Sequence, residues 1–269
     1  MKLLSPLIAL FQAVFLVLWL VFWITASGLA ALVTFNGDVP LMLARRFWAP
    51  MHWRITGSPL LVEPLPDVDW SKPHIFLMNH QSTLDIPVAF AVIPVNIRFI
   101  AKHVLKWIPF LGWYMTVTGM IFINRSNRRE AMRGLKLAGE RIRAGSNLLA
   151  FPEGTRSNDG RILSFKRGTF VLALEAGVPI IPMAIEGTLR MLPPRSILLR
   201  RGPIRVKMGP PIATTGLEGK QSDALMHQVH DIIIQLHRDI GGAGGVPDDA
   251  VATGDGKSLD LAGRPENPT

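Results

Sequence analysis

The chain has 269 residues, a formal net charge of +9 and no cysteine. The lack of cysteine excludes disulfide scaffolds and thiolate chemistry, and the length suits one compact α/β domain with appendages. The positive charge lies mostly in residues 38–240 and favours an anionic partner, such as nucleic acid, anionic lipid headgroups or a phosphorylated substrate.

The first 37 residues carry a single charge, Lys2, and Leu7–Ile24 is apolar except for Gln12. An apolar run of about eighteen residues or more predicts a membrane helix. The alternative is a cleaved signal peptide, with Lys2 at its basic start and small residues at 26–28 near the cleavage point. A second apolar stretch, Leu29–Phe35, either extends the helix or returns as a hairpin within one leaflet. We therefore expect residues 1–37 to form a membrane-embedded helix or helical hairpin.

Residues 38–71 mix aromatic side chains with arginines, as in Arg45-Arg46-Phe47-Trp48. This composition suits the headgroup layer, so we expect an interfacial amphipathic connection that contacts anionic membrane lipids. Arg45, Arg46 and Arg54 outweigh Lys2, and the positive-inside rule then places the main domain on the cytoplasmic side of the membrane. A hairpin would leave both ends on one side, and the same rule favours the cytoplasm.

Residues 72–240 alternate short β-rich runs with helical patterns and are expected to form the main domain. This alternation predicts an α/β fold with a mixed, largely parallel sheet flanked by helices. Polar chemistry then collects at the carboxyl ends of the strands. The expected strands are His74–Asn79, Ile97–Ala101, Thr118–Ile123, Leu148–Phe151, Pro179–Ile185 and Ile204–Met208. The expected helices are Ile86–Ile93, Ser126–Ala144, Lys166–Ala176 and Glu218–Ile240.

The C-terminal part offers no further chemistry. Residues 241–269 hold seven glycines and three prolines without an apolar period, so we expect a disordered tail. His227, His230 and His237 lie beside the apolar stripe of the last expected helix, but no carboxylate joins them in a recognisable ligand set, so no metal is predicted.

The chain has one tyrosine, and its tryptophans lie mostly in membrane-like stretches. Nucleic-acid binding, which pairs basic residues with base-stacking aromatics, is therefore not expected.

The first candidate site follows the apolar run at residues 75–78, where His80 and Asp85 are five positions apart. On a continuous helix the two side chains would point about 140° apart, so they meet only if the chain turns between them. A strand, a loop at 79–81 and a helix that begins near Ser82–Asp85 would supply that turn, and Pro87 suits a first helical turn. The alternative is that Asp85 is a helix cap in an [ST]-x-x-[DE] pattern and His80 an ordinary loop histidine.

The second candidate site is Phe151–Ser157, after the apolar run at residues 147–150. Gly154 lets backbone N–H groups approach a ligand closely, and Arg156 offers a planar fork suited to a phosphate. The alternative is a surface turn with an incidental ion pair between Glu153 and Arg156.

The two motifs together resemble those of the glycerolipid acyltransferase family, and within it the lysophosphatidic acid acyltransferases. The order N-H-x-x-x-x-D, then F-P-E-G-T-R-S, is accompanied by three further blocks, and the resemblance covers roughly residues 72–210. Val104 stands where the family often has glutamate. The three blocks are Lys102–Leu105 with Pro109 and Gly112, Gly119–Arg125, and Val178–Ala184.

The resemblance implies a role for each motif. His80 would be the general base and Asp85 would hold its ring. The phosphate and glycerol of the acceptor would be bound by Lys102, Arg125, Glu153, Gly154, Thr155 and Arg156. A base near neutral pKa activates a hydroxyl, and oxyanion donors are expected among backbone N–H groups near the helix start after His80.

The implied reaction moves a fatty acyl group from acyl-CoA or acyl carrier protein to the sn-2 hydroxyl of 1-acylglycerol 3-phosphate and forms phosphatidic acid. The donor is a substrate, and no bound cofactor is implied. Three alternatives stay open: another lyso-lipid acceptor, a serine-dependent lipid hydrolase using Ser82 or Ser157, and a non-catalytic lipid-binding protein. The hydrolase lacks a G-x-S-x-G motif. The sequence leaves the oligomeric state open.

Overall fold

The computed structural model describes residues 5–124, 127–194, 196 and 198–245. In these residues a seven-stranded sheet forms the centre of the molecule, in the order β1-β7-β6-β2-β5-β3-β4. β6 and β7 pair antiparallel and the other neighbours pair parallel. The predicted mixed, largely parallel sheet flanked by helices is confirmed. The strands are β1 (Leu60–Val62), β2 (Ile75–Met78), β3 (Ile97–Lys102), β4 (Ile121–Ile123), β5 (Asn147–Ala150), β6 (Ile180–Glu186) and β7 (Ile204–Met208).

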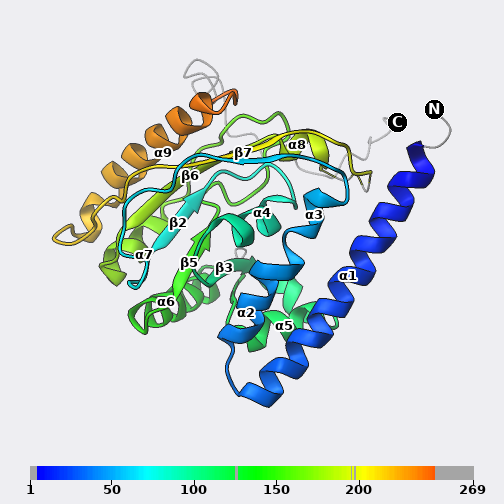
Figure 1. The fold of residues 1–269 in the computed structure, drawn as a ribbon. Coiled ribbons are helices and arrows are strands. Elements are labelled where there is room, and N and C mark those ends of the chain that lie inside the picture. Colours follow the sequence, from blue (N-terminus) through cyan, green and yellow to red (C-terminus); the bar gives the residue numbers. More distant parts are fainter. Residues whose placement is uncertain (1–4, 125–126, 195, 197, 246–269) are drawn as a thin grey trace, which may run out of the picture.

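Helices cover both faces of this sheet (Figure 1). β2 is buried on both faces: Phe76 and Met78 belong to one hydrophobic cluster, and Ile75 and Leu77 belong to the other. The first cluster is shared with α4 (Asp85–Val92) and the N-terminal helices, and the second with α6 (Arg128–Arg143), α7 (Gly168–Ala176) and α9 (Ser222–Asp239). A strand apolar on both faces is typical of the centre of a parallel sheet.

The expected elements of the main domain are present, with differences at their edges. The expected strand Thr118–Ile123 begins at Ile121, because Thr118 is the C-cap of a helix that the sequence did not predict, α5 (Leu111–Val117). Gly119, with φ +79°, then turns the chain into β4. The short elements β1, η2 (His103–Trp107) and α8 (Thr188–Met191) were also not predicted, and the expected helix Glu218–Ile240 is divided into the short η3 (Gly219–Gln221) and α9.

The N-terminal segment is one long helix, α1 (Ser5–Thr34), so Leu29–Phe35 extends the helix instead of folding back within it. Its window Leu10–Thr34 is long and apolar enough to cross a membrane. The chain then returns beside α1 as α2 (Asp38–Leu43), η1 (Ala44–Trp48) and α3 (Met51–Arg54) (Figure 1). Two side chains of α1 hydrogen-bond to the returning segment: Gln12 donates to Ile55 O, and Trp19 donates to Trp48 O.

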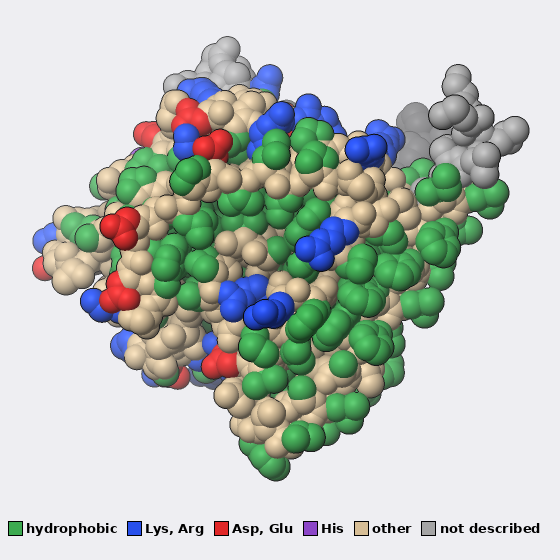
Figure 2. Space-filling view, in the orientation of Figure 1, with side chains coloured by type: hydrophobic (Ala, Val, Ile, Leu, Met, Phe, Trp, Pro, Cys, Tyr) green, Lys and Arg blue, Asp and Glu red, His purple; other side chains and the backbone are tan. Residues whose placement is uncertain are grey.

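The outer face of α1 is exposed and apolar, and Figure 2 shows hydrophobic side chains gathered along it. Leu32 is 70% exposed and Phe11 is 67% exposed. A contiguous apolar surface of this kind marks an interaction with lipid or protein.

At the other end of the chain, residues 241–245 lie against the main domain, where Gly244 O accepts a hydrogen bond from Ile162 N. The rest of the tail expected to be disordered, 246–269, lies outside the described residues.

Candidate active site

His80 and Asp85 meet at the carboxyl end of β2. The chain leaves the strand, turns through residues 79–84 and enters α4 at Asp85. His80 Nδ1 lies 2.7 Å from Asp85 Oδ2, and the aspartate is fully buried while the His80 side chain keeps 16% exposure. Since an ionised carboxylate accepts and does not donate, Nδ1 carries the proton and Nε2 keeps a free lone pair. This geometry fits a general base whose ring is oriented by a carboxylate.

The Asp85 carboxylate also organises the turn. Its Oδ2 accepts from Gln81 N at 2.6 Å and from Ser82 N at 2.8 Å, and its Oδ1 accepts from Thr188 Oγ1 at 2.5 Å. Since α4 begins at Asp85 with Leu84 as its N-cap and without a side-chain cap hydrogen bond, the Ser82 contact stabilises the turn before the helix and is compatible with orienting His80. Because the Gln81 and Ser82 amides donate to Asp85, these two groups do not supply the expected oxyanion donors.

The second motif lies beside the first because β5 pairs with β2. The Phe151 ring stacks on the His80 ring, with centroids 3.9 Å apart and an interplanar angle of 18°. Ser157 N donates to His80 O at 2.8 Å. The motifs, about seventy residues apart in sequence, therefore form one site.

Glu153 is part of the frame behind His80. It is 2% exposed; its Oε1 accepts from His80 N at 2.7 Å and its Oε2 from Leu163 N at 3.0 Å. Burial raises the pKa of Glu153 to about 8; the two N–H donors oppose this shift and the nearby Asp85 charge adds to it. Both oxygens of Glu153 thus face the backbone, not open solvent where an acceptor would bind.

The other residues predicted to bind the acceptor lie nearer to solvent. Arg156 is exposed and donates to Thr83 Oγ1 at 2.8 Å, which directs its guanidinium toward the start of α4. Thr155 is exposed beside it, and Gly154 has φ +74°, a conformation that favours glycine. Lys102 is exposed at the end of β3, on the same edge of the sheet. Arg125 lies outside the described residues.

The serines proposed as hydrolase nucleophiles are buried. Ser82 is fully buried and its Oγ donates to Leu192 O at 2.7 Å. Ser157 is 1% exposed and its Oγ donates to Asp159 Oδ1 at 3.0 Å. Neither hydroxyl is positioned to attack a substrate carbonyl, which argues against the hydrolase alternative.

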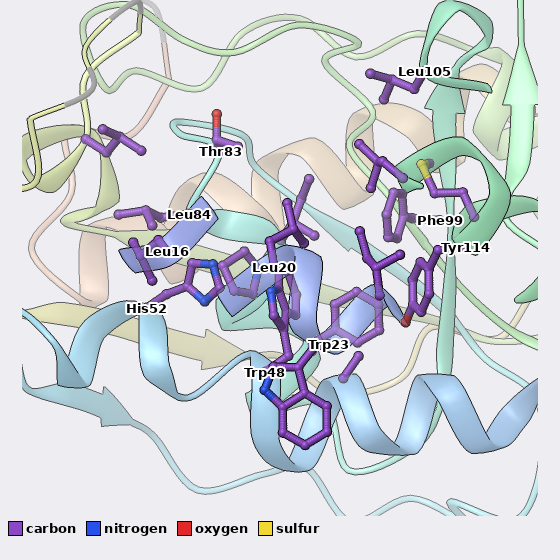
Figure 3. Close-up of a pocket in the computed structure, with 18 of the residues that line it drawn as sticks. Leu16, Leu20, Trp23, Trp48, His52, Thr83, Leu84, Phe99, Leu105 and Tyr114 are labelled. Carbon is purple, nitrogen blue, oxygen red and sulfur yellow. The ribbon is translucent and has the colours of Figure 1, made fainter. Parts of the chain in front are cut away.

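The sequence did not reveal an apolar cavity of about 390 Å³ beside the first motif. It lies between α1, η1, α4 and α5, and Thr83 and Leu84 of the His80–Asp85 loop form part of its wall (Figure 3). His52 lines it as a neutral ring, since burial lowers its pKa to about 4 against hydrogen bonds to Ala49 and Trp48. The sequence signal was the apolar N-terminal helix, which was assigned to lipid alone.

In the described residues no group of three or more His, Cys, Asp or Glu side chains is arranged to hold a metal ion. His237, one of the three C-terminal histidines, instead contacts Glu186, with Nε2 3.0 Å from Oε2.

Comparison with known proteins identifies an acyltransferase domain. Residues 60–186 match the model of the Acyltransferase family. The chain is 36% identical over 173 residues to a 1-acyl-sn-glycerol-3-phosphate acyltransferase of Saccharomyces cerevisiae, covering 63% of this chain and 57% of that one. It is 34% identical over 175 residues to the chloroplastic enzyme LPAT1 of Arabidopsis thaliana, covering 65% and 47%.

A solved structure has the same fold. The crystal structure of the 1-acyl-sn-glycerophosphate acyltransferase PlsC from Thermotoga maritima superposes with a TM-score of 0.77 at 26% identity, covering 88% of this chain and 96% of that one. The chain spans about half the length of the curated relatives it matches. The matched segment, the relatives and the shared fold show that the chain contains an acyltransferase domain and has the fold of a solved 1-acyl-sn-glycerophosphate acyltransferase.

Proposed function

We propose that this protein transfers a fatty acyl group from a thioester donor to the sn-2 hydroxyl of 1-acylglycerol 3-phosphate and produces phosphatidic acid. The observation that carries this proposal is the His80–Asp85 contact, with the second ring nitrogen free, beside an apolar cavity. A base oriented by a buried carboxylate activates an alcohol, and the cavity offers an apolar site of a size that suits an acyl chain. The names of the similar proteins agree with this acceptor.

In the proposed reaction His80 Nε2 removes the proton from the acceptor hydroxyl. The hydroxyl oxygen attacks the thioester carbon, the carbon–sulfur bond breaks, and the thiol leaves with the proton returned from His80. Asp85 stabilises the charged ring while it holds that proton. Since the thioester is already activated, no enzyme nucleophile is needed.

The anionic acceptor would be bound by the exposed cations at the carboxyl edge of the sheet, Arg156 and Lys102, together with Arg125. A phosphomonoester carries nearly two negative charges, which several cations and a guanidinium fork match. Thr155 and the glycine turn at Gly154 complete the proposed acceptor site, and Glu153 would contribute by fixing the His80 backbone. Acyl-CoA and acyl carrier protein both remain candidate donors.

We further propose that residues 1–37 anchor the protein with its catalytic domain on the cytoplasmic side, connected by the interfacial segment 38–71. Along Gln12–Ser27 the helix α1 packs on the domain and lines the cavity. A helix held in this way lies along one leaflet more readily than across both, with its exposed apolar face in the lipid.

The test is acyl transfer by the purified protein in lipid vesicles. Labelled acyl-CoA and acyl carrier protein donors are offered with a panel of lyso-lipids, including 1-acylglycerol 3-phosphate and lysophospholipids without a phosphomonoester. We expect phosphatidic acid as the main product and its loss in His80→Ala. Release of free fatty acid at the same rate without an acceptor would instead support a hydrolase. Retention of the reaction in His80→Ala would refute the assigned base.

A further inference from the structure

A buried histidine on the C-terminal helix contacts the loop that carries His80. His237 of α9 is fully buried, and its Nε2 lies 3.0 Å from Glu186 Oε2. Its Nδ1 accepts a hydrogen bond from Gly244 N at 3.2 Å, so the ring proton is on Nε2, which donates to Glu186. α9 lies outside the segment matched by the family model.

Glu186 connects His237 to the residue next to the proposed base. Gln81 Nε2 donates to Glu186 Oε2 at 3.0 Å and lies 3.1 Å from His237 Nε2, so both donors converge on one carboxylate oxygen. The same Gln81 amide donates to Gly160 O at 3.3 Å, and the Gln81 backbone N–H donates to Asp85. Gln81 is thereby tied at once to β6, to the loop after the second motif and to the turn that holds His80.

Residues 241–245, which follow α9, also contact the chain just after the Phe151–Ser157 loop directly. Gly244 O accepts from Ile162 N at 2.8 Å, and Ile162 pairs with Gly245. The next residue, Leu163, donates its N–H to Glu153. Gly242 lies directly over the His237 ring, and a Cβ atom at this position would overlap it.

We propose that His237 and residues 241–245 form a C-terminal clamp that positions the His80 loop and the Phe151–Ser157 loop relative to each other. They act through Gln81 and Ile162 and are positioning residues, not catalytic ones. The clamp rests on the proposed acyl transfer, since its effect is on the geometry of His80. A displacement of about 1 Å in a catalytic group can cost about 10²-fold in rate, so the clamp affects kcat more than substrate binding.

The test compares full-length variants with matched controls. His237→Ala removes the donor to Glu186, and Gly242→Ala displaces the ring without changing any polar group. Both are expected to lower kcat about 10- to 100-fold, with both KM values changed by less than about threefold. His237→Gln, whose amide can donate to Glu186 and accept from Gly244, recovers most of the loss. The controls are His227→Ala, on an exposed position of α9, and Gly219→Ala, where a Cβ atom meets nothing within 4 Å.

Hydrogen–deuterium exchange gives a readout that needs no activity. We expect faster exchange in the peptide that spans residues 79–85 in His237→Ala and Gly242→Ala, with unchanged exchange in α5, which packs against α1 and η2. Unchanged exchange in that peptide, or a rise spread evenly over the core, overturns the clamp. An inactive wild-type protein would contradict the proposed function while the exchange result still decides the clamp. If His237→Ala does not fold, Gly242→Ala and His237→Gln provide the same comparison.

Discussion

The two sides of His80 are built differently. Behind the ring, the frame of Asp85, Glu153 and Gln81 is buried, and its donors and acceptors hold one another at 2.6–3.3 Å. In front of it, Arg156 is exposed, and within the described part of the chain its side chain makes one hydrogen bond, to Thr83. A densely paired frame resists rearrangement, whereas exposed groups with few partners are available to a ligand. The contrast indicates that the frame determines kcat and the open side determines affinity and selectivity.

The strongest test of the frame is Asp85→Asn. The amide leaves the shape nearly unchanged but cannot stabilise the charged ring, and it favours the wrong ring tautomer, for which losses of up to about 10⁴-fold in kcat are known. We expect kcat to fall by about 10²- to 10⁴-fold, with the acceptor KM nearly unchanged, in steady-state acyl-transfer assays. Asp69→Asn, on an exposed surface loop, is the control. An equal loss in both variants would show that the charge of Asp85 has no special part in the chemistry.

The open side is tested by Arg156→Ala. Because charge-assisted, bidentate contacts to a phosphate are stronger than neutral hydrogen bonds, we expect the acceptor KM to rise about 10- to 100-fold with a smaller change in kcat. Arg156→Lys restores little, since an ammonium lacks the planar fork. Arg161→Ala, on the same loop with Asp159 as its partner, should be near wild type. An unchanged KM for the phosphomonoester would remove Arg156 from the acceptor site.

Glu153 predicts how the frame responds to pH. Its pKa in the folded protein is about 8 because of burial, above its usual 4.5. A carboxyl with a raised folded pKa contributes stability that is fully present below about pH 4.5 and is lost as pH rises through about 8. We therefore expect the free energy of unfolding to fall by an amount on the order of a few kcal/mol between about pH 5 and pH 8.5, and Tm to fall with it. Glu153→Gln should flatten this dependence in thermal-denaturation scans.

Glu153→Gln also distinguishes the hydrogen bonds that Glu153 accepts from the effect of its titration. The amide of Glu153→Gln can accept from one of the two backbone N–H groups and presents its own donor to the other, which costs about 1–3 kcal/mol. Glu175→Gln, outside the frame, should keep the wild-type pH dependence. A Tm profile that is the same for wild type and Glu153→Gln would mean that Glu153 is ionised throughout.

The local parts of this arrangement were predictable from the sequence. The turn between His80 and Asp85 follows from an apolar strand, a polar loop and Pro87 in a first helical turn, all within thirteen residues. The strand Ile204–Met208 was predicted at its observed bounds, since its alternating apolar residues have period two. The short edge strand β1 was not, because Leu61 and Val62 are about half exposed, at 48% and 43%, and three residues carry little pattern.

Contacts between segments that are far apart in the chain could not be predicted from the sequence. Glu153 was expected to face the acceptor, and its place behind His80 depends on β5 pairing beside β2, which no local pattern encodes. Thr188 on Asp85 is another contact made across more than a hundred residues. The sequence predicted a membrane helix for α1, and the helix is long and apolar enough to be one. The sequence did not show that one face of α1 lines a cavity of the main domain, because composition does not tell which apolar face contacts protein.

The inner face of α1 lines the apolar cavity on the open side of His80. A substitution on this face has the smallest effect that we expect on the rate, and it tests whether the cavity holds the acyl chain. Ser27 is 1% exposed and lines the cavity from α1, so Ser27→Trp fills space that a long acyl chain would occupy. We expect kcat/KM for the longest donors to fall several-fold while short donors are nearly unaffected, because each buried methylene is worth about 0.8 kcal/mol. Competition assays with mixed donors measure this ratio. Leu29→Trp, on the exposed face of the same helix, places the same indole side chain outside the cavity and should leave the preference as it is. If both variants shift it equally, the donor chain lies elsewhere and the open side is defined by its cations alone.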